Sequence, residues 1–191
     1  YLPGGMQAVS VSDDASLIIW DLTNYVPQAI LKAGESSQAA LAVLPDGRAA
    51  LSATSAGEII RWDLQDAALL QRFGSHEDAI FDVDYSPDGK AALSCAGAGT
   101  PNMPARDASL RLWDIQSGGL LQTMQPRVLV NWQCAVSPDG RWALSGAYDG
   151  SVRLWELSNG RQIGLLSGDT YWVVSLAFSP DGKKALSGTK D

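Results

Sequence analysis

One five-residue turn sequence recurs along the chain at a nearly constant spacing. Its proline stands at Pro3, Pro45, Pro87, Pro138 and Pro180, which are 42, 42, 51 and 42 residues apart. A tryptophan followed by Asp or Glu keeps the same step, at Trp20, Trp62, Trp113 and Trp155. Because two independent markers share one period, the chain is predicted to repeat one supersecondary unit.

Each period is predicted to contain four strands, named a to d, and no helix. The Pro-Asp-Gly turn fixes φ at the proline and supplies a glycine for a left-handed exit, which is typical of a hairpin between strands a and b. Stretches such as 143–147, 152–155 and 174–178 are rich in Val, Leu and aromatic residues and are bounded by turn residues. The predicted strands number seventeen, and the predicted repeats are 1–37, 38–78, 79–129, 130–171 and 172–191, the first and last incomplete.

These motifs resemble the WD-repeat family of β-propellers, whose repeat carries a Ser-Pro-Asp-Gly turn, a Leu-Ser-Gly segment, an Asp-Gly turn and a closing Trp-Asp. The copy SPDGRWALSGAYDGSVRLWELSNGR matches nearly throughout. The resemblance implies an all-β propeller of about four and a quarter blades of four-stranded antiparallel sheets. A closed four-bladed ring is not expected, because its shared blade would own two b strands, 6–12 and 183–189. The seven-bladed ring typical of the family needs about 290 residues, so this chain is predicted to be a segment of a longer ring.

Four residues of the third repeat, His76, Ser94, Asp107 and Trp113, include the residue types of a nucleophilic triad. The resemblance implies a structural role instead, since the matching residues of WD repeats form a buried hydrogen-bond relay between strands b and c and the loop before strand a. Partial sets occur in the other repeats: Ser10, Asp14 and Trp20; Ser52 and Trp62, with Ala56 in place of the Asp; Ser145, Asp149 and Trp155, with Arg127 near the His position; and Ser187 with Asp191. Catalytic groups are not copied around a ring, so no catalytic residue is predicted.

Composition and motifs exclude several classes of function. A net charge of −7 without a Lys/Arg cluster disfavours nucleic acid and anionic membranes as partners. No apolar run could cross a bilayer and residues 1–20 lack a signal-peptide layout, so neither membrane insertion nor secretion is predicted and a cytoplasmic location is expected. Cys95 and Cys134 are predicted to be buried apolar residues. One histidine and the absence of metal-binding or phosphate-binding motifs predict no metal and no cofactor.

A protein or peptide partner is expected at the top face, where the b-to-c turns and the loops before strand a lie. Family resemblance places several aromatic residues at positions that contact partners: Phe81, Trp132, Tyr148, Tyr171 and Trp172. The alternative for them is packing between blades or lining the axis, whereas Trp142 is expected to be ordinary packing. The b-to-c turn of the third repeat carries nine extra residues within 95–106, with Met103 and Arg106 as candidate contacts. The alternative for this insert is an idle loop.

The favoured function is a non-enzymatic interaction scaffold or sensor. The regular copies resemble bacterial WD-repeat proteins, in which such propellers often follow kinase or nucleotide-binding switch modules, so a signalling role with a fused effector domain outside this segment is the working hypothesis. Two alternatives stay open. One is a structural subunit of a stable multiprotein assembly, and the other, more remote, is a propeller enzyme.

Overall fold

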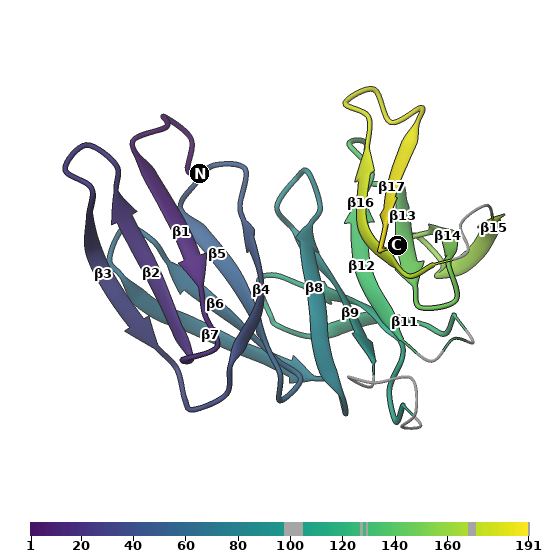
Figure 1. The fold of residues 1–191 in the computed structure, drawn as a ribbon, viewed down its shortest axis with the longest axis horizontal. Helices are drawn as coiled ribbons and strands as arrows, with labels where there is room; N and C mark the ends of the chain where they lie inside the picture. Colours follow the sequence, from purple (N-terminus) through teal and green to yellow (C-terminus); the bar gives the residue numbers. More distant parts are fainter. Residues whose placement is uncertain (98–104, 127, 129, 168–170, 191) are drawn as a thin grey trace.

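The computed structural model describes residues 1–97, 105–126, 128, 130–167 and 171–190. In these ranges the chain has seventeen strands in five antiparallel sheets and no helix, as predicted (Figure 1). The sheets, which we call blades one to five, contain two, three or four strands in chain order. Blade one contains β1 (Gln7–Val11), β2 (Ser16–Asp21) and β3 (Val26–Lys32). Blade five contains β16 (Val173–Phe178) and β17 (Ala185–Thr189).

The three central blades are four-stranded. Blade two contains β4 (Gln38–Val43), β5 (Ala49–Thr54), β6 (Glu58–Asp63) and β7 (Ala68–Ser75). Blade three contains β8 (Ala79–Tyr85), β9 (Ala91–Gly97), β10 (Leu110–Asp114) and β11 (Leu120–Met124). Blade four contains β12 (Asn131–Val136), β13 (Trp142–Ala147), β14 (Ser151–Glu156) and β15 (Arg161–Ser167). In each, the strands pair in sequence order, which is the predicted a-b-c-d arrangement.

Pro-Asp-Gly turns join strands a and b, as the sequence predicts. In blade four the amide of Gly140 donates to the carbonyl of Ser137 at 2.8 Å, and φ of Gly140 is +70°. The Asp139 carboxylate accepts the Ser137 hydroxyl at 2.6 Å and the Arg141 amide at 3.0 Å. Only glycine adopts such a φ at low cost, so the turn fixes the register of the two strands.

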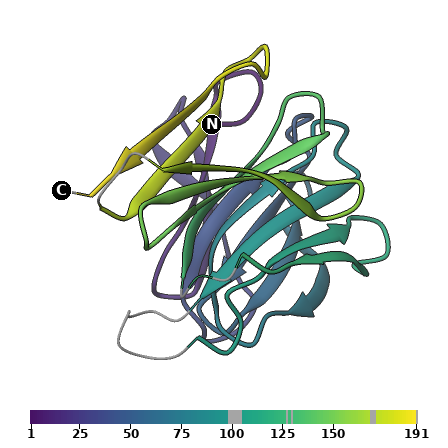
Figure 2. The ribbon, with the colours of Figure 1, turned by 90° about the vertical axis from the view of Figure 1, so that its right-hand side faces the viewer.

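The blades follow one another along an arc with their first strands on the inside (Figure 1). β4 lies next to β8, β8 next to β12, and β12 next to β16. Figure 2 shows the structure from the side of blades four and five, with the β16–β17 hairpin (yellow) at the upper left and the green sheet of blade four in front of the teal and blue sheets. We call the end of the sheets where β4, β8, β12 and β16 begin the top edge. It lies at the lower side of the view in Figure 1.

The hydrophobic core is divided into layers between neighbouring blades. One layer joins blades two and three and another joins blades three and four. The first contains Leu51, Ile59, Phe73, Ile80, Val83 and Trp113, and the second contains Leu93, Leu110, Met124, Cys134 and Trp155. The free cysteines Cys95 and Cys134 are buried, as predicted. Small residues between the large ones let each sheet pack on both faces.

One leucine of strand b shows how burial depends on neighbouring strands. Leu51, Leu93 and Leu144 are fully or almost fully buried, whereas Leu186, which has the same register on β17, is 74% exposed. The strands β5, β9 and β13 are flanked on both sides, but β17 pairs with β16 alone. In Figure 1 blades one and five lie at opposite ends of the arc. The size of a complete ring stays a prediction.

Candidate functional site

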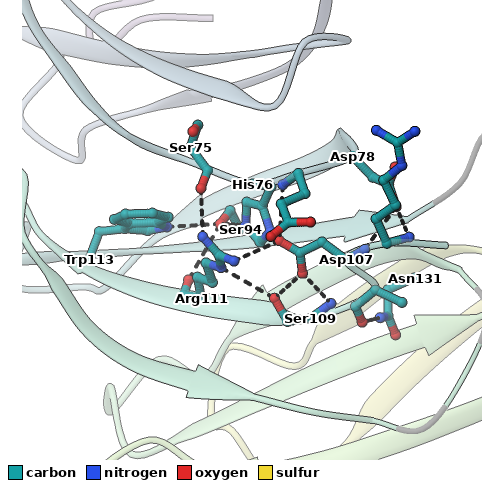
Figure 3. Close-up of polar contacts among 12 residues, drawn as sticks. Ser75, His76, Asp78, Ser94, Asp107, Ser109, Arg111, Trp113 and Asn131 are labelled. Carbon is teal, nitrogen blue, oxygen red and sulfur yellow. Dashed lines mark hydrogen bonds and ion pairs between the residues drawn. The ribbon is translucent and has the colours of Figure 1, made fainter.

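The structure brings His76, Ser94, Asp107 and Trp113 together in blade three (Figure 3). His76 precedes β8, and its Nε2 lies 2.7 Å from the Ser94 hydroxyl on β9 while its Nδ1 lies 3.0 Å from the Asp107 carboxylate. The indole N–H of Trp113 on β10 donates to the same Ser94 hydroxyl at 2.9 Å. All four residues are buried, so these bonds join strands b and c to the loop before strand a.

Burial and hydrogen bonds shift the pKa values of the two titratable members of this relay, His76 and Asp107. Burial opposes ionisation of Asp107, but hydrogen bonds from His76 and Ser109 outweigh it and hold the pKa of Asp107 well below its usual range. Burial lowers the pKa of His76, although the hydrogen bond to Asp107 acts in the opposite direction. His76 is therefore neutral at pH 7, with Nδ1–H donating to Asp107 and Nε2 accepting from Ser94.

Arg111 and Arg153 also belong to these networks, although neither is among the predicted relay residues. Arg111 pairs with Asp107 at 2.7 Å, and Arg153 pairs with Asp149 at 3.1 Å in blade four. The signal in the sequence is the spacing Asp-x-Ser-x-Arg, which occurs in both blades. In both blades the Asp precedes strand c, and its carboxylate accepts the serine amide, Ser109 or Ser151, at 3.0 or 3.1 Å.

The remaining blades retain only part of the relay. The indole N–H of the strand-c tryptophan donates to the strand-b serine in each of blades one, two and four, at 2.8 to 2.9 Å: Trp20 to Ser10, Trp62 to Ser52, and Trp155 to Ser145. Asp14 instead accepts the amide and hydroxyl of Ser16. Ser187 stands at the equivalent position on β17, and Arg127 and Asp191 lie outside the described residues. Among the residues that the structure describes, all four residue types are joined in blade three alone.

The loop that carries His76 also contacts blade two, at Gly57. The amide of His76 donates to the Gly57 carbonyl at 2.9 Å, and φ of Gly57 is +84°. A Cβ at this position would lie 2.4 Å from the His76 carbonyl oxygen and 2.8 Å from that of Asp78. Side chains are therefore excluded here both by φ and by space.

Replacing Gly57 with alanine is expected to lower the free energy of unfolding by about 2–4 kcal/mol, because it adds backbone strain and a clash with backbone atoms that cannot swing away. Chemical denaturation measures the change. The matched control is Gly188→Ala, where the added Cβ would make an ordinary contact of 3.5 Å with Ser175. Equal and small effects of the two substitutions would contradict this packing.

A second cluster, at the top edge, consists of four aromatic side chains that we call the aromatic row: Phe81, Trp132, Trp172 and Tyr148. The ring centroids of Phe81 and Trp132 lie 4.4 Å apart. Trp132 and Trp172 are almost parallel, with centroids 6.1 Å apart, and Tyr148 lies 4.6 Å from Trp172. All four are half-buried and come from blades three, four and five, so the row crosses two blade junctions.

Bulges in β8 and β12 set the direction of two side chains of the row, Phe81 and Trp132. The register shifts between Ile80 and Asp82 and between Asn131 and Gln133, so Phe81 and Trp132 face no partner residue across the sheet. A bulge of this kind redirects a side chain. Trp172 lies immediately before β16, ahead of the corresponding bulge, and stacks on Trp132 of blade four.

The sequence profile described as "WD domain, G-beta repeat" matches residues 67–114, 122–156 and 160–191, which is more than half of the chain. The chain belongs to the WD-repeat family. The matched segments begin just before β7 of blade two and end after β17, and they contain the complete WD-repeat relay and the whole aromatic row. A comparison with curated protein sequences returned no match. Among the described residues no helix is long and apolar enough to span a bilayer.

The other predicted contact residues of this WD-repeat chain are placed less closely together. Tyr171 is 53% exposed beside the row, without a ring contact to it among the described residues. Arg106 is exposed, and its amide donates to Asp78 at 2.6 Å. Trp142 is half-buried on β13 under the Arg141 guanidinium. Met103 and most of the insert lie outside the described residues.

Proposed function

We propose that this WD-repeat chain is a non-enzymatic interaction scaffold, a single propeller domain over 1–191, whose aromatic row binds a protein or peptide partner. The observation that carries the proposal is the row itself, four half-exposed rings in contact across three blades at one edge. Rigid aromatic side chains with little rotamer freedom dominate binding energy at protein interfaces. A half-buried row on a sheet scaffold costs little ordering entropy when a partner covers it.

Burial of the relay supports a non-enzymatic role. Ser94 has no exposed surface, and its hydroxyl is held by the His76 ring and the Trp113 indole. A substrate carbonyl needs a nucleophile within reach, so this serine is in the wrong place for acyl transfer. The further proposals follow the family resemblance: a cytoplasmic sensor of bacterial type in signalling, with an effector domain outside this sequence.

Replacing Phe81 and Trp132 together with alanine is expected to weaken partner binding by at least about tenfold, since two anchor side chains are lost. The measurement uses the full-length parent protein to capture a partner from native extract and then determines the affinity of purified wild type and variant by calorimetry. Unfolding curves confirm that the variant still folds cooperatively. Trp172→Ala, outside the strands, is a second variant with less effect on folding.

The control for this pair is Tyr25→Ala. Tyr25 is 87% exposed in the turn between β2 and β3, at the end of blade one opposite the top edge. It should bind the partner as wild type does. Unchanged affinity of Phe81→Ala/Trp132→Ala, with cooperative unfolding, would reject the row as the docking surface.

A second candidate function is a structural subunit of a stable assembly, held through its side. Exposed apolar residues on the outer strands favour it: Leu69 and Leu70 on β7, Leu120 and Leu121 on β11, and Ile163 and Leu165 on β15. Large permanent interfaces are more hydrophobic than transient ones. This candidate predicts a stoichiometric companion that survives high salt and is lost when Leu121 is replaced by Lys.

A further inference from the structure

Two carboxylates reach from β8 to the free edge of β12, immediately below the aromatic row. Asp82 accepts the amide of Cys134 at 3.0 Å, and Asp84 accepts the amide of Val136 at 2.8 Å. These amides lie on the edge of β12 that is not paired with β13. The equivalent residues of the other inner strands are Ala40 and Ala42, Gln133 and Ala135, and Ser175 and Ala177. The acidic pair is therefore particular to the junction of blades three and four.

Among the described residues, neither carboxylate has a cationic partner. In the ranges that the structure describes, no Lys, Arg or His lies within ion-pair distance of Asp82 or Asp84. Burial, with a contribution from the charge of Asp84, raises the pKa of Asp82 to about 7. Both side chains remain partly exposed, and a carboxylate oxygen that accepts one amide can accept further donors. A cation that docks at this junction would therefore meet two unpaired carboxyl groups and would favour their ionised form.

The β8 bulge brings the carboxylate of Asp82 next to Phe81 of the aromatic row. Phe81 reaches the Trp132 ring and Asp82 reaches the Cys134 amide, so two successive side chains both extend from β8 to β12. The row also holds a cation already, since Lys190 Nζ lies 5.3 Å from the centroid of Trp172. Faces of indole and phenol rings attract cations, and nearby carboxylates strengthen that attraction.

We propose that the aromatic row and the carboxylates of Asp82 and Asp84 form one site for an arginine side chain of the partner. This inference rests on the proposed function and names the chemistry of the docked residue. A planar guanidinium stacks on Phe81 or Trp132 while its N–H groups donate to Asp82 and Asp84. A net charge of −7 favours approach of such a cationic partner.

The test is a titration of the intact protein followed by two-dimensional NMR of the tryptophan indole N–H groups. The probes are acetyl-Gly-Arg-Gly-amide and the same peptide with citrulline, which has nearly the shape of arginine and no charge. The arginine peptide is expected to shift the Trp132 and Trp172 signals saturably, and the citrulline peptide to require at least about tenfold higher concentration. Asp82→Asn/Asp84→Asn, which keeps acceptors for both amides, should reduce the arginine peptide to the citrulline level.

The matched control is Asp46→Asn/Asp139→Asn, which removes the same charge from turns at the opposite end of blades two and four. It should leave the titration unchanged. Equal binding of the two peptides, no shift with either peptide, or full arginine affinity in Asp82→Asn/Asp84→Asn would each overturn the arginine site. The row as a docking surface fails separately, through unchanged partner affinity in Phe81→Ala/Trp132→Ala.

Discussion

Replacing His76 with alanine is expected to lower the free energy of unfolding by about 2–4 kcal/mol, because it opens a cavity and leaves buried groups with fewer partners. The Nδ1–H donor to Asp107 and the Nε2 acceptor for Ser94 are both lost. The edge contact of the imidazole with Trp113, at 6.1 Å between centroids, is lost as well. Equilibrium denaturation of wild type and variant measures the change.

A double-mutant cycle separates the hydrogen bond from the cavity. Asp107→Asn and His76→Ala are combined, and a coupling energy of at least about 1 kcal/mol is expected for two groups in direct contact. Glu77→Ala is the control, because this exposed neighbour contributes only its backbone amide to Asp107. A His76→Ala protein of unchanged stability that loses an enzymatic turnover would contradict the structural role and revive the enzyme alternative.

Replacing Asp82 with asparagine is expected to remove part of the pH dependence of folding. Burial raises the pKa of the folded carboxyl to about 7 from an ordinary value of 3.8. Between these values the folded state holds a proton that the unfolded state has released, so this group lowers stability as pH rises toward 7 and changes it little above. Relative to wild type, Asp82→Asn should gain about 3 kcal/mol between pH 4.5 and pH 8.

Other titratable groups also affect the pH dependence of stability, and they determine which control is needed. Asp84 is raised in pKa by burial and acts in the same direction, while Cys95 and Cys134, whose thiols also have raised pKa values through burial, stay neutral over this range. Asp107 acts in the opposite direction, because its lowered pKa adds stability that is lost as pH falls. Asp139→Asn, on an exposed turn, should leave the profile above pH 4.5 unchanged. Parallel profiles for Asp82→Asn and wild type would contradict the buried carboxylate.

The sequence was sufficient for the repeat, the turn chemistry and the order of strands, because each depends on local residues at constant spacing. The Pro-Asp-Gly turn and the Trp-Asp pair recur in register, and a blade repeats with them. The contacts inside the relay follow from the same register. These features are local to one blade, which is why residue types and spacing are enough to predict them.

Contacts between blades were harder to predict. Trp172 and Trp132 do not share a repeat position, and their stacking joins a residue at the bulge in β12 to one that precedes β16. Asp82 and Asp84 are two acidic residues in an apolar strand, and only the neighbouring edge of β12 shows what their carboxylates bind. Their alternation with Phe81 and Val83 was the one signal available in the sequence.

Site-specific photo-cross-linking can show whether a partner contacts the top edge at the aromatic row. A photoreactive residue replaces one of three residues in separate variants: Tyr171 beside the row, Tyr25 in the turn between β2 and β3, or Leu121 on the outer strand β11. We expect a cross-linked protein partner from position 171 and none from positions 25 and 121. A partner cross-linked from position 121 or 25 and absent at 171 would contradict it.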